Sequence, residues 1–251
     1  MIQLHKDIIN LETVSSTNDF AKQLLSKQIP DSDITIVSTQ EQTKGRGQIG
    51  NCWESTTGMN CTFSIIIKPH NIKPEKQFYI SMITSLAMVE FLRTYIKQPV
   101  SIKWPNDIYC QNKKICGILI ENTLMGEIIE TSIIGIGLNV NQTTFSKAIP
   151  NPTSLAQETG KNFETEAVLH EFISIFEKWL KTLLTGTLTG ILKAYKQNLY
   201  LFKTESQFCD ENGPFLGKII DIKPNGILQI EHSNTQLIRE YIFKEVQYIH
   251  N

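Results

Sequence analysis

Residues 113–121 read KKICGILIE, and this stretch decides the fold because its part at 115–121 predicts a strand that is apolar on both faces. Successive side chains of a strand point to opposite faces, and an almost unbroken apolar run supplies both of them here. Strands of that kind lie in sheets that are covered on both sides. Lys114 would enter such a covered sheet, where a lysine is seldom placed without a partner, whereas Lys113 would point the other way and stay solvated.

Further strands and several helices are expected around this stretch. The β-branched and apolar runs predict strands at 34–38, 62–67, 100–103 and 128–138. Helical patterns follow the loop at 14–18 and the polar residues at 151–154, and they also occupy 73–96 and 168–183. The sequence therefore predicts an α+β fold, in which helices pack on a mixed sheet.

The hydrophobic periodicity changes in the last part of the chain. Short β-like pieces at 215–222, 227–231 and 237–242 are separated by turn signals at Asn225-Gly226 and Ser233-Asn234. We expect a larger domain at 1–200 and a small barrel or sandwich at 205–251. A domain of this size buries little of its surface when it folds alone, so we expect it to dock on the larger domain.

Composition limits the classes of function. The chain has 251 residues, 41% of them hydrophobic and 20% charged, which is typical of a globular protein. Its 24 basic and 25 acidic side chains give a net charge of -1, which disfavours nucleic-acid binding. Five cysteines without a CxxC pair favour neither a disulfide framework nor a zinc site. No signal peptide or membrane-length apolar run is recognisable, so we expect a cytoplasmic protein without a membrane partner.

A glycine-rich, basic segment is the strongest candidate for a binding loop. Residues 40–53 contain glycines at 45, 47 and 50 beside Lys44 and Arg46. Glycines let a backbone approach a ligand closely, and the cations suit an anionic one. A flexible basic surface loop is the alternative. The segment is not a GxxxxGK[ST] phosphate loop, because no Lys-Ser or Lys-Thr follows its last glycine.

A second candidate lies at 103–107, where the sequence reads KWPND. Pro105 interrupts a strand, so the polar side chains of Lys103, Asn106 and Asp107 should be exposed at the strand end. Such a group of side chains could bind a metal-bound phosphate. The alternative is a structural turn with Trp104 packed in the core.

Taken in order, Ser16-Thr17-Asn18, the 44–53 loop, and the segments 103–107, 113–121 and 135–141 resemble the biotin protein ligases, also called biotin-[acetyl-CoA-carboxylase] ligases. The resemblance covers about 10–155 and extends more weakly to 215–246, which is similar to the small SH3-like domain of that family. It implies a catalytic domain akin to class II aminoacyl-tRNA synthetases, followed by an SH3-like β-barrel. It also implies the monofunctional type, because the first block begins too early to leave room for an N-terminal DNA-binding domain.

The resemblance implies a two-step reaction with biotin, ATP and Mg²⁺. Biotin is activated as biotinyl-5'-AMP and then passes to a lysine of a biotin carboxyl carrier protein. The ligase itself would be a monomer or a homodimer.

The same resemblance assigns the site residues. Lys114 and Arg46 would be catalytic. The biotin-binding residues would be Ser16, Thr17, Asn18, Gln42, Gly45, Arg46, Gly47, Gln48, Lys114 and Gly117. The ATP-binding residues would be Arg46, Gly47, Gln48, Gly50, Asn51, Trp53, Asn106, Asp107, Lys114 and Asn139. Of these, Asn106 and Asp107 are candidates for orienting Mg²⁺ and Lys114; the metal ligands themselves stay unassigned.

One departure from the family pattern has a chemical consequence. Gln48 and Asn51 stand where the commonest family loop has basic residues. A neutral amide binds phosphate more weakly than a cation does, by about 1 kcal/mol per contact. We therefore hypothesise faster loss of the adenylate.

Two other functions compete with the ligase. A lipoyl or octanoyl transferase of the same superfamily would use Cys116, because Lys114 and Cys116 should share a strand face and an ammonium activates a thiolate. Against that, Cys116 is equally well a small buried core residue. The other competitor is a non-catalytic nucleotide-binding module.

Overall fold

A seven-stranded mixed sheet forms the centre of the computed structural model, which describes residues 3–27, 30–48, 51–69 and 72–249. Its strand order is β1-β2-β3-β7-β6-β5-β4; β1 and β2 are parallel, and all other neighbours are antiparallel. The strands are β1 Lys6–Val14, β2 Ile34–Gln42, β3 Cys61–Ile67, β4 Val100–Lys103, β5 Asp107–Cys110, β6 Lys113–Met125 and β7 Ile128–Leu138. The predicted mixed sheet is confirmed.

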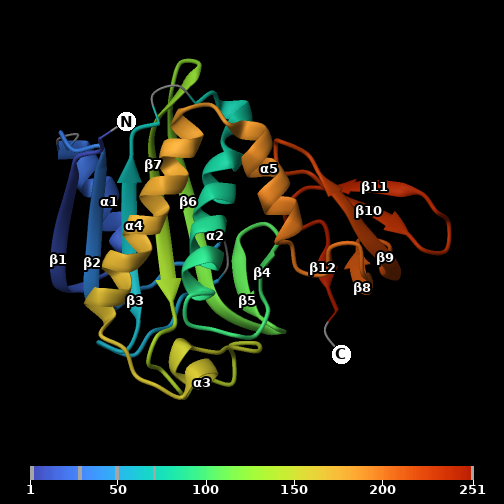
Figure 1. The fold of residues 1–251 in the computed structure, drawn as a ribbon, viewed down its shortest axis with the longest axis horizontal. Coiled ribbons are helices and arrows are strands. Elements are labelled where there is room, and N and C mark those ends of the chain that lie inside the picture. The colour runs from blue at the N-terminus through green and yellow to red at the C-terminus, as the bar shows by residue number, and fades with distance from the viewer. Residues whose placement is uncertain (1–2, 28–29, 49–50, 70–71, 250–251) are drawn as a thin grey trace.

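Helices cover both faces of this sheet, as the apolar run at 113–121 required. On one face lie α2 (Phe78–Leu92), α4 (Thr165–Leu184) and α5 (Leu188–Gln197), of which α2 is buried almost all round (Figure 1). The other face carries α1 (Thr17–Lys27), whose Ala21 packs on Ile66 and Ile133 in a separate small core. Their strand neighbours Ile65 and Ile134 belong to the main core, so both faces of β3 and β7 are apolar.

The predicted helix at 73–96 is longer than the observed helix α2 at both ends, because α2 ends at Leu92. Pro74–Lys76 forms a short 3-10 turn, and the α-helix begins only at Phe78. The short helix predicted after 151–154 is α3 (Leu155–Thr159), whose first turn is capped by the Ser154 side chain accepting from the backbone N–H of Gln157.

A second sheet of five antiparallel strands follows the first and lies beside its β4–β5 edge (Figure 1). It has the order β11-β10-β9-β8-β12, with β8 Glu205–Asp210, β9 Gly213–Ile222, β10 Leu228–His232, β11 Ile238–Tyr241 and β12 Gln247–Tyr248. Trp104 Nε1 donates to the Gly226 carbonyl at 2.9 Å, which ties the two sheets together. The docking that the sequence predicts is thus present. This sheet is compatible with the expected SH3-like domain, although it is not closed into a barrel among the described residues, since β11 and β12 remain unpaired edges and β12 has only two residues.

Within the described part of the chain, the helices lack the combination of length and apolarity that a membrane span requires.

Candidate active site

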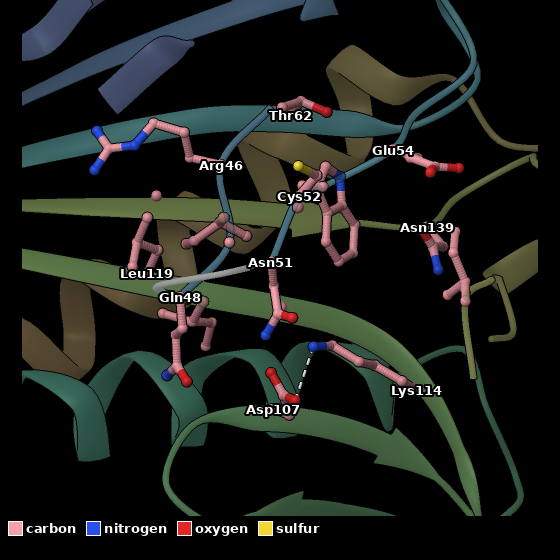
Figure 2. A pocket seen from close by; sticks show the side chains of 18 of the residues that line it. Arg46, Gln48, Asn51, Cys52, Glu54, Thr62, Asp107, Lys114, Leu119 and Asn139 are labelled. Carbon is pink, nitrogen blue, oxygen red and sulfur yellow. Dashed lines mark ion pairs between the residues drawn. The ribbon is translucent and has the colours of Figure 1, made fainter. Parts of the chain in front are cut away.

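One cavity of about 490 Å³ collects most of the predicted site residues. Its floor is formed by β6 and β7, and its walls come from the start of α1, the loop after β2, the β4–β5 turn and the segment before α3. Figure 2 shows the side chains that line it. A volume of this size is typical of a site for a small organic ligand.

Uncharged polar groups form one end of the cavity. The backbone N–H and hydroxyl of Thr17 both donate to Gln42 Oε1, at 2.8 and 3.1 Å. Ser64 Oγ on β3 lies 2.7 Å from Thr17 Oγ1 and donates to Asn18 Oδ1 at 2.6 Å. Ser16, Thr17 and Asn18 are all buried. Sequence reasoning missed Ser64, although a serine inside an apolar strand was a usable signal.

Three glycines make the floor of the cavity flat. A Cβ at Gly135 would lie 2.3 Å from Asn18 Oδ1, and one at Gly137 would lie 2.2 Å from Trp53 Cε2. Gly117, the partner of Gly137 in the sheet, also faces the Trp53 ring. The Trp53 indole therefore rests on bare backbone, and its buried Nε1 has no hydrogen-bond partner among the described residues.

Lys114 lies at the far end from the Thr17 group. Its Nζ pairs with Asp107 Oδ2 at 2.7 Å and lies 6.0 Å from the centre of the Trp53 ring (Figure 2). The backbone of Lys114 is fixed as well, because its N–H donates to Asn151 and its carbonyl accepts from Thr153. The sequence expected Asp107 to orient Lys114, and the structure places the two in contact.

A second lysine belongs to the same wall; the sequence placed it in the candidate segment 103–107 but did not assign it to the site. Lys103 lines the cavity at the end of β4, and its Nζ donates to the Tyr109 hydroxyl at 3.1 Å. Burial lowers the pKa of Lys103, against the opposing effect of Asp107, and nearby Lys114 lowers it further.

Arg46 points away from Lys114. Its guanidinium pairs with Asp19 and, at 2.8 Å, with Glu121, on the opposite side of the view in Figure 2. Burial raises the pKa of Glu121, but hydrogen bonds from Lys22, Asn18 and Arg46 outweigh it and hold that pKa below its usual value. The contact with Glu121 was not predicted.

The loop is also fastened on the β4–β5 side. Gln48 Nε2 donates to Asn106 Oδ1 at 3.2 Å, and buried Asn106 donates in turn to the Ile118 carbonyl at 3.0 Å. Asn106 therefore supports the wall from behind rather than lining it, and Gly45 does not line the cavity either. Gly50 lies outside the described residues.

Both interpretations of 103–107 hold in part. Trp104 is packed as the structural alternative expected, while Asp107 reaches the cavity.

Asn51 and Asn139 complete the predicted nucleotide side. Exposed Asn51 lines the cavity and closes the glycine turn, since its carbonyl accepts from the Gly47 N–H at 3.0 Å. Asn139 is buried, and its amide donates to the Thr153 carbonyl at 2.8 Å, so it holds the segment before α3 against β7.

The expectation that Cys116 shares a face with Lys114 is wrong. A bulge in the β5–β6 pairing sets Tyr109 opposite Lys114 and Ile108 opposite Cys116, which leaves Ile115 as an extra residue. The alternation therefore shifts by one, and Gly117 rather than Cys116 lies beside the Lys114 side chain. Cys116 is fully buried in the main core, and burial raises the pKa of its thiol despite the opposing effect of Lys114.

The described residues contain no group of three or more His, Cys, Asp or Glu side chains arranged to hold a metal ion. Single oxygen donors such as Asp107 are present in the cavity wall.

The sequence matches the biotin/lipoate A/B protein ligase family over residues 11–139. The chain belongs to this family. The matched region runs from β1 to Asn139 and so contains all the site residues that the sequence predicted.

Relatives of this ligase family support the assignment along the chain. A bifunctional ligase/repressor BirA from Bacillus spizizenii is 30% identical over 227 residues, which cover 89% of this chain and 69% of that protein. A biotin–[acetyl-CoA-carboxylase] ligase from Mycobacterium tuberculosis is 27% identical over 58% of this chain and 54% of its own length. The solved biotin protein ligase from Aquifex aeolicus in complex with biotin and ATP superposes with a TM-score of 0.79, at 28% identity, over 97% of this chain and 99% of that one.

Proposed function

We propose that this chain is an ATP-dependent biotin protein ligase. It activates biotin as biotinyl-5'-AMP and transfers the biotinyl group to a lysine of a biotin carboxyl carrier protein. The observation that carries the proposal is a single cavity with uncharged hydrogen-bonding groups at one end and Lys114 fixed at the other. Relatives of the same family are named for this activity, and one was solved with biotin and ATP.

The uncharged end suits a neutral ring that carries both donors and acceptors. A ureido group offers N–H and carbonyl groups but no charge, and Ser16, Thr17 and Gln42 supply matching partners. Because these side chains are already held by Ser64 and by one another, little ordering is needed when the ligand enters. The glycine floor continues from there towards Lys114, and the Trp53 indole covers it at Gly117 and Gly137.

Lys114 would stabilise the reaction centre. In the first step a biotin carboxylate oxygen attacks the α-phosphorus of ATP, a C–O–P linkage forms, and pyrophosphate leaves. Two anions must approach each other, so a fixed ammonium offsets their repulsion and the charge that develops in the transition state. In the second step the acceptor amine attacks the acyl carbon, and AMP leaves. No nucleophile of the protein is required.

Mg²⁺ would enter with ATP. This ion commonly binds through one or two carboxylates together with substrate phosphates, rather than in an all-protein cage. Asp107 fits that requirement, since it lies in the cavity wall beside Lys114, and Asn106, the neighbouring residue, would help to orient the ion and Lys114. The ion would neutralise phosphate charge.

We also propose the division into a catalytic domain at 1–200 and an SH3-like domain at 205–251. A monomeric or homodimeric state, a cytoplasmic location and the absence of nucleic-acid and membrane partners stay predictions.

A mass measurement tests the function directly. The chain is incubated with biotin, Mg-ATP and a biotin carrier domain, and the acceptor should gain the mass of one biotinyl group while pyrophosphate is released. A non-catalytic binding module would release none, and an acceptor whose mass stays unchanged would contradict the proposal.

Substituting Gln48 with arginine should lengthen retention of the adenylate. The added cation restores a charged contact with phosphate, worth about 1 kcal/mol or roughly fivefold in dissociation rate. The measurement is the release of radiolabelled biotinyl-5'-AMP after a chase with unlabelled biotin. Gln48→Glu is the matched control and should shorten retention. Equal or shorter retention in Gln48→Arg would count against the charge argument.

Replacing Cys116 with alanine should leave biotin transfer within about twofold of the unmodified chain. The thiol is buried on the core side of β6, away from Lys114, so its loss affects packing and not chemistry. Loss of transfer in Cys116→Ala at an unchanged melting temperature, with transfer in the parent chain independent of ATP, would instead support an acyl-enzyme.

A further inference from the structure

Glu121 accepts hydrogen bonds from three donors that lie in two other parts of the chain. Its carboxylate accepts from Asn18 Nδ2 at 2.9 Å, from Lys22 Nζ at 2.7 Å and from Arg46 Nη2 at 2.8 Å. These donors belong to α1 and to the glycine loop, whereas Glu121 belongs to β6. The acid therefore joins two walls of the cavity to its floor.

Glu121 is placed to act through its partners rather than on a substrate. Seven residues of extended strand, roughly 20 Å, separate it from Lys114. It also lies outside the cavity lining, with 23% of its side chain exposed. Asn18 and Arg46, in contrast, both line the cavity. Any effect of Glu121 on the reaction must pass through them.

A continuous set of hydrogen bonds links Glu121 to the uncharged end. The Asn18 amide donates to Glu121 and accepts from Ser64, so the acid fixes which way that amide faces. Ser64 lies next to Thr17, which in turn is bound to Gln42. On its other side Glu121 holds the only arginine of the loop residues 43–53.

We propose that Glu121 is a positioning residue that sets the orientation of Arg46 and Asn18 together, and so fixes the glycine loop relative to the uncharged end of the cavity. This inference rests on the proposed ligase function, because Arg46 and Asn18 both line the cavity that would then hold biotin. Lys22, Arg46 and the Asn18 amide all bind the Glu121 carboxylate, so removing its charge weakens the three contacts together.

The kinetic test is a double-substitution cycle on the full chain. Glu121→Gln should lower kcat/KM for biotin-dependent pyrophosphate release about fivefold, and Arg46→Gln should lower it about fiftyfold. Because Glu121 acts in part through Arg46, Glu121→Gln should slow the Arg46→Gln variant by clearly less than the fivefold loss it causes in the unmodified chain, since one partner of the acid is already gone and only Asn18 remains. Glu121→Asp, which keeps the charge, should recover part of the loss. Glu130→Gln on neighbouring β7 is the matched control and should match the unmodified chain.

A second measurement needs no substrate. Trypsin cleaves after arginine and lysine, and the loop contains Lys44 and Arg46 two residues apart. Glu121→Gln leaves the guanidinium paired with Asp19 alone, at the exposed end of its contacts, so cleavage after Arg46 should rise at least threefold relative to cleavage after Lys44, as read by mass spectrometry. A general loosening of the loop would raise both cuts equally.

These readouts separate the two proposals. If the unmodified chain forms no adenylate, the ligase function fails, and the ratio of the two cuts still decides whether Glu121 positions Arg46. If adenylate forms, multiplicative losses in the double variant would overturn the positioning role alone. Equal increases at both cuts, or a Glu121→Gln variant that behaves like Glu130→Gln, would overturn it too.

Discussion

Replacing Lys114 with alanine is expected to slow the formation of biotinyl-5'-AMP about 10³-fold, which corresponds to roughly 4 kcal/mol of transition-state stabilisation. The ammonium is fixed at two levels, by Asp107 through its side chain and by Asn151 and Thr153 through its backbone. Such a preorganised charge needs no rearrangement when the carboxylate and the α-phosphate meet, so its loss should appear mainly in kcat. Biotin-dependent pyrophosphate release under single-turnover conditions measures this step.

The chain offers its own control for this prediction. Lys113 is the preceding residue, is exposed and belongs to the same strand, so Lys113→Ala removes an equal charge without reaching the cavity. It should leave the rate within about twofold, in line with the small effect of most exposed substitutions. Adenylate formation at its original speed in Lys114→Ala would refute the role given to Lys114 and, with it, the proposed chemistry.

The parts of the fold that sequence predicted well are those with a dense apolar pattern. The strands at 100–103 and 128–138 have the predicted bounds, because turn residues flank apolar runs there. The edge strand β1 was missed, since its sequence KDIINLETV mixes charge with apolar residues and its partner is parallel, which leaves no hairpin signal. Strand β5 is only four residues long, and its start at Asp107 was interpreted as part of a turn.

The candidate site also has features that the sequence predicted and features that only the folded chain shows. The resemblance to the ligase family, carried by short sequence blocks, assigned Thr17, Gln42 and Lys114 to the site, and all three line the cavity. The face of Cys116 was mispredicted because a bulge, which depends on the pairing of β5 with β6, has no signal in β6 alone. The pairing of Arg46 with Glu121 joins residues 75 positions apart, and only the folded sheet brings them together.

A Gly135→Ala substitution should raise the biotin KM roughly 50-fold, because it would disturb two or three hydrogen bonds of about 1 kcal/mol each. The new Cβ would lie 2.3 Å from Asn18 Oδ1, far inside contact distance, so the Asn18 side chain must move. Its bonds with Ser64 and Glu121 would then be lost together, and the uncharged end of the cavity would lose its shape. Steady-state kinetics with biotin as the varied substrate measure the change, and kcat should fall less than KM rises.

Two further variants separate this steric effect from a general weakening of the sheet. Gly190→Ala adds the same methyl group to helix α5, where the nearest atom would lie 3.5 Å away, and it should leave the biotin KM unchanged. In the Gly135→Ala, Asn18→Ala double variant the clash is removed, so the melting temperature should recover. The biotin KM should stay high, since Asn18 itself is then missing. A Gly135→Ala variant with an unaltered biotin KM would show that the Asn18 cluster does not bind this substrate, because the contact at Gly135 leaves that cluster no room to keep its arrangement.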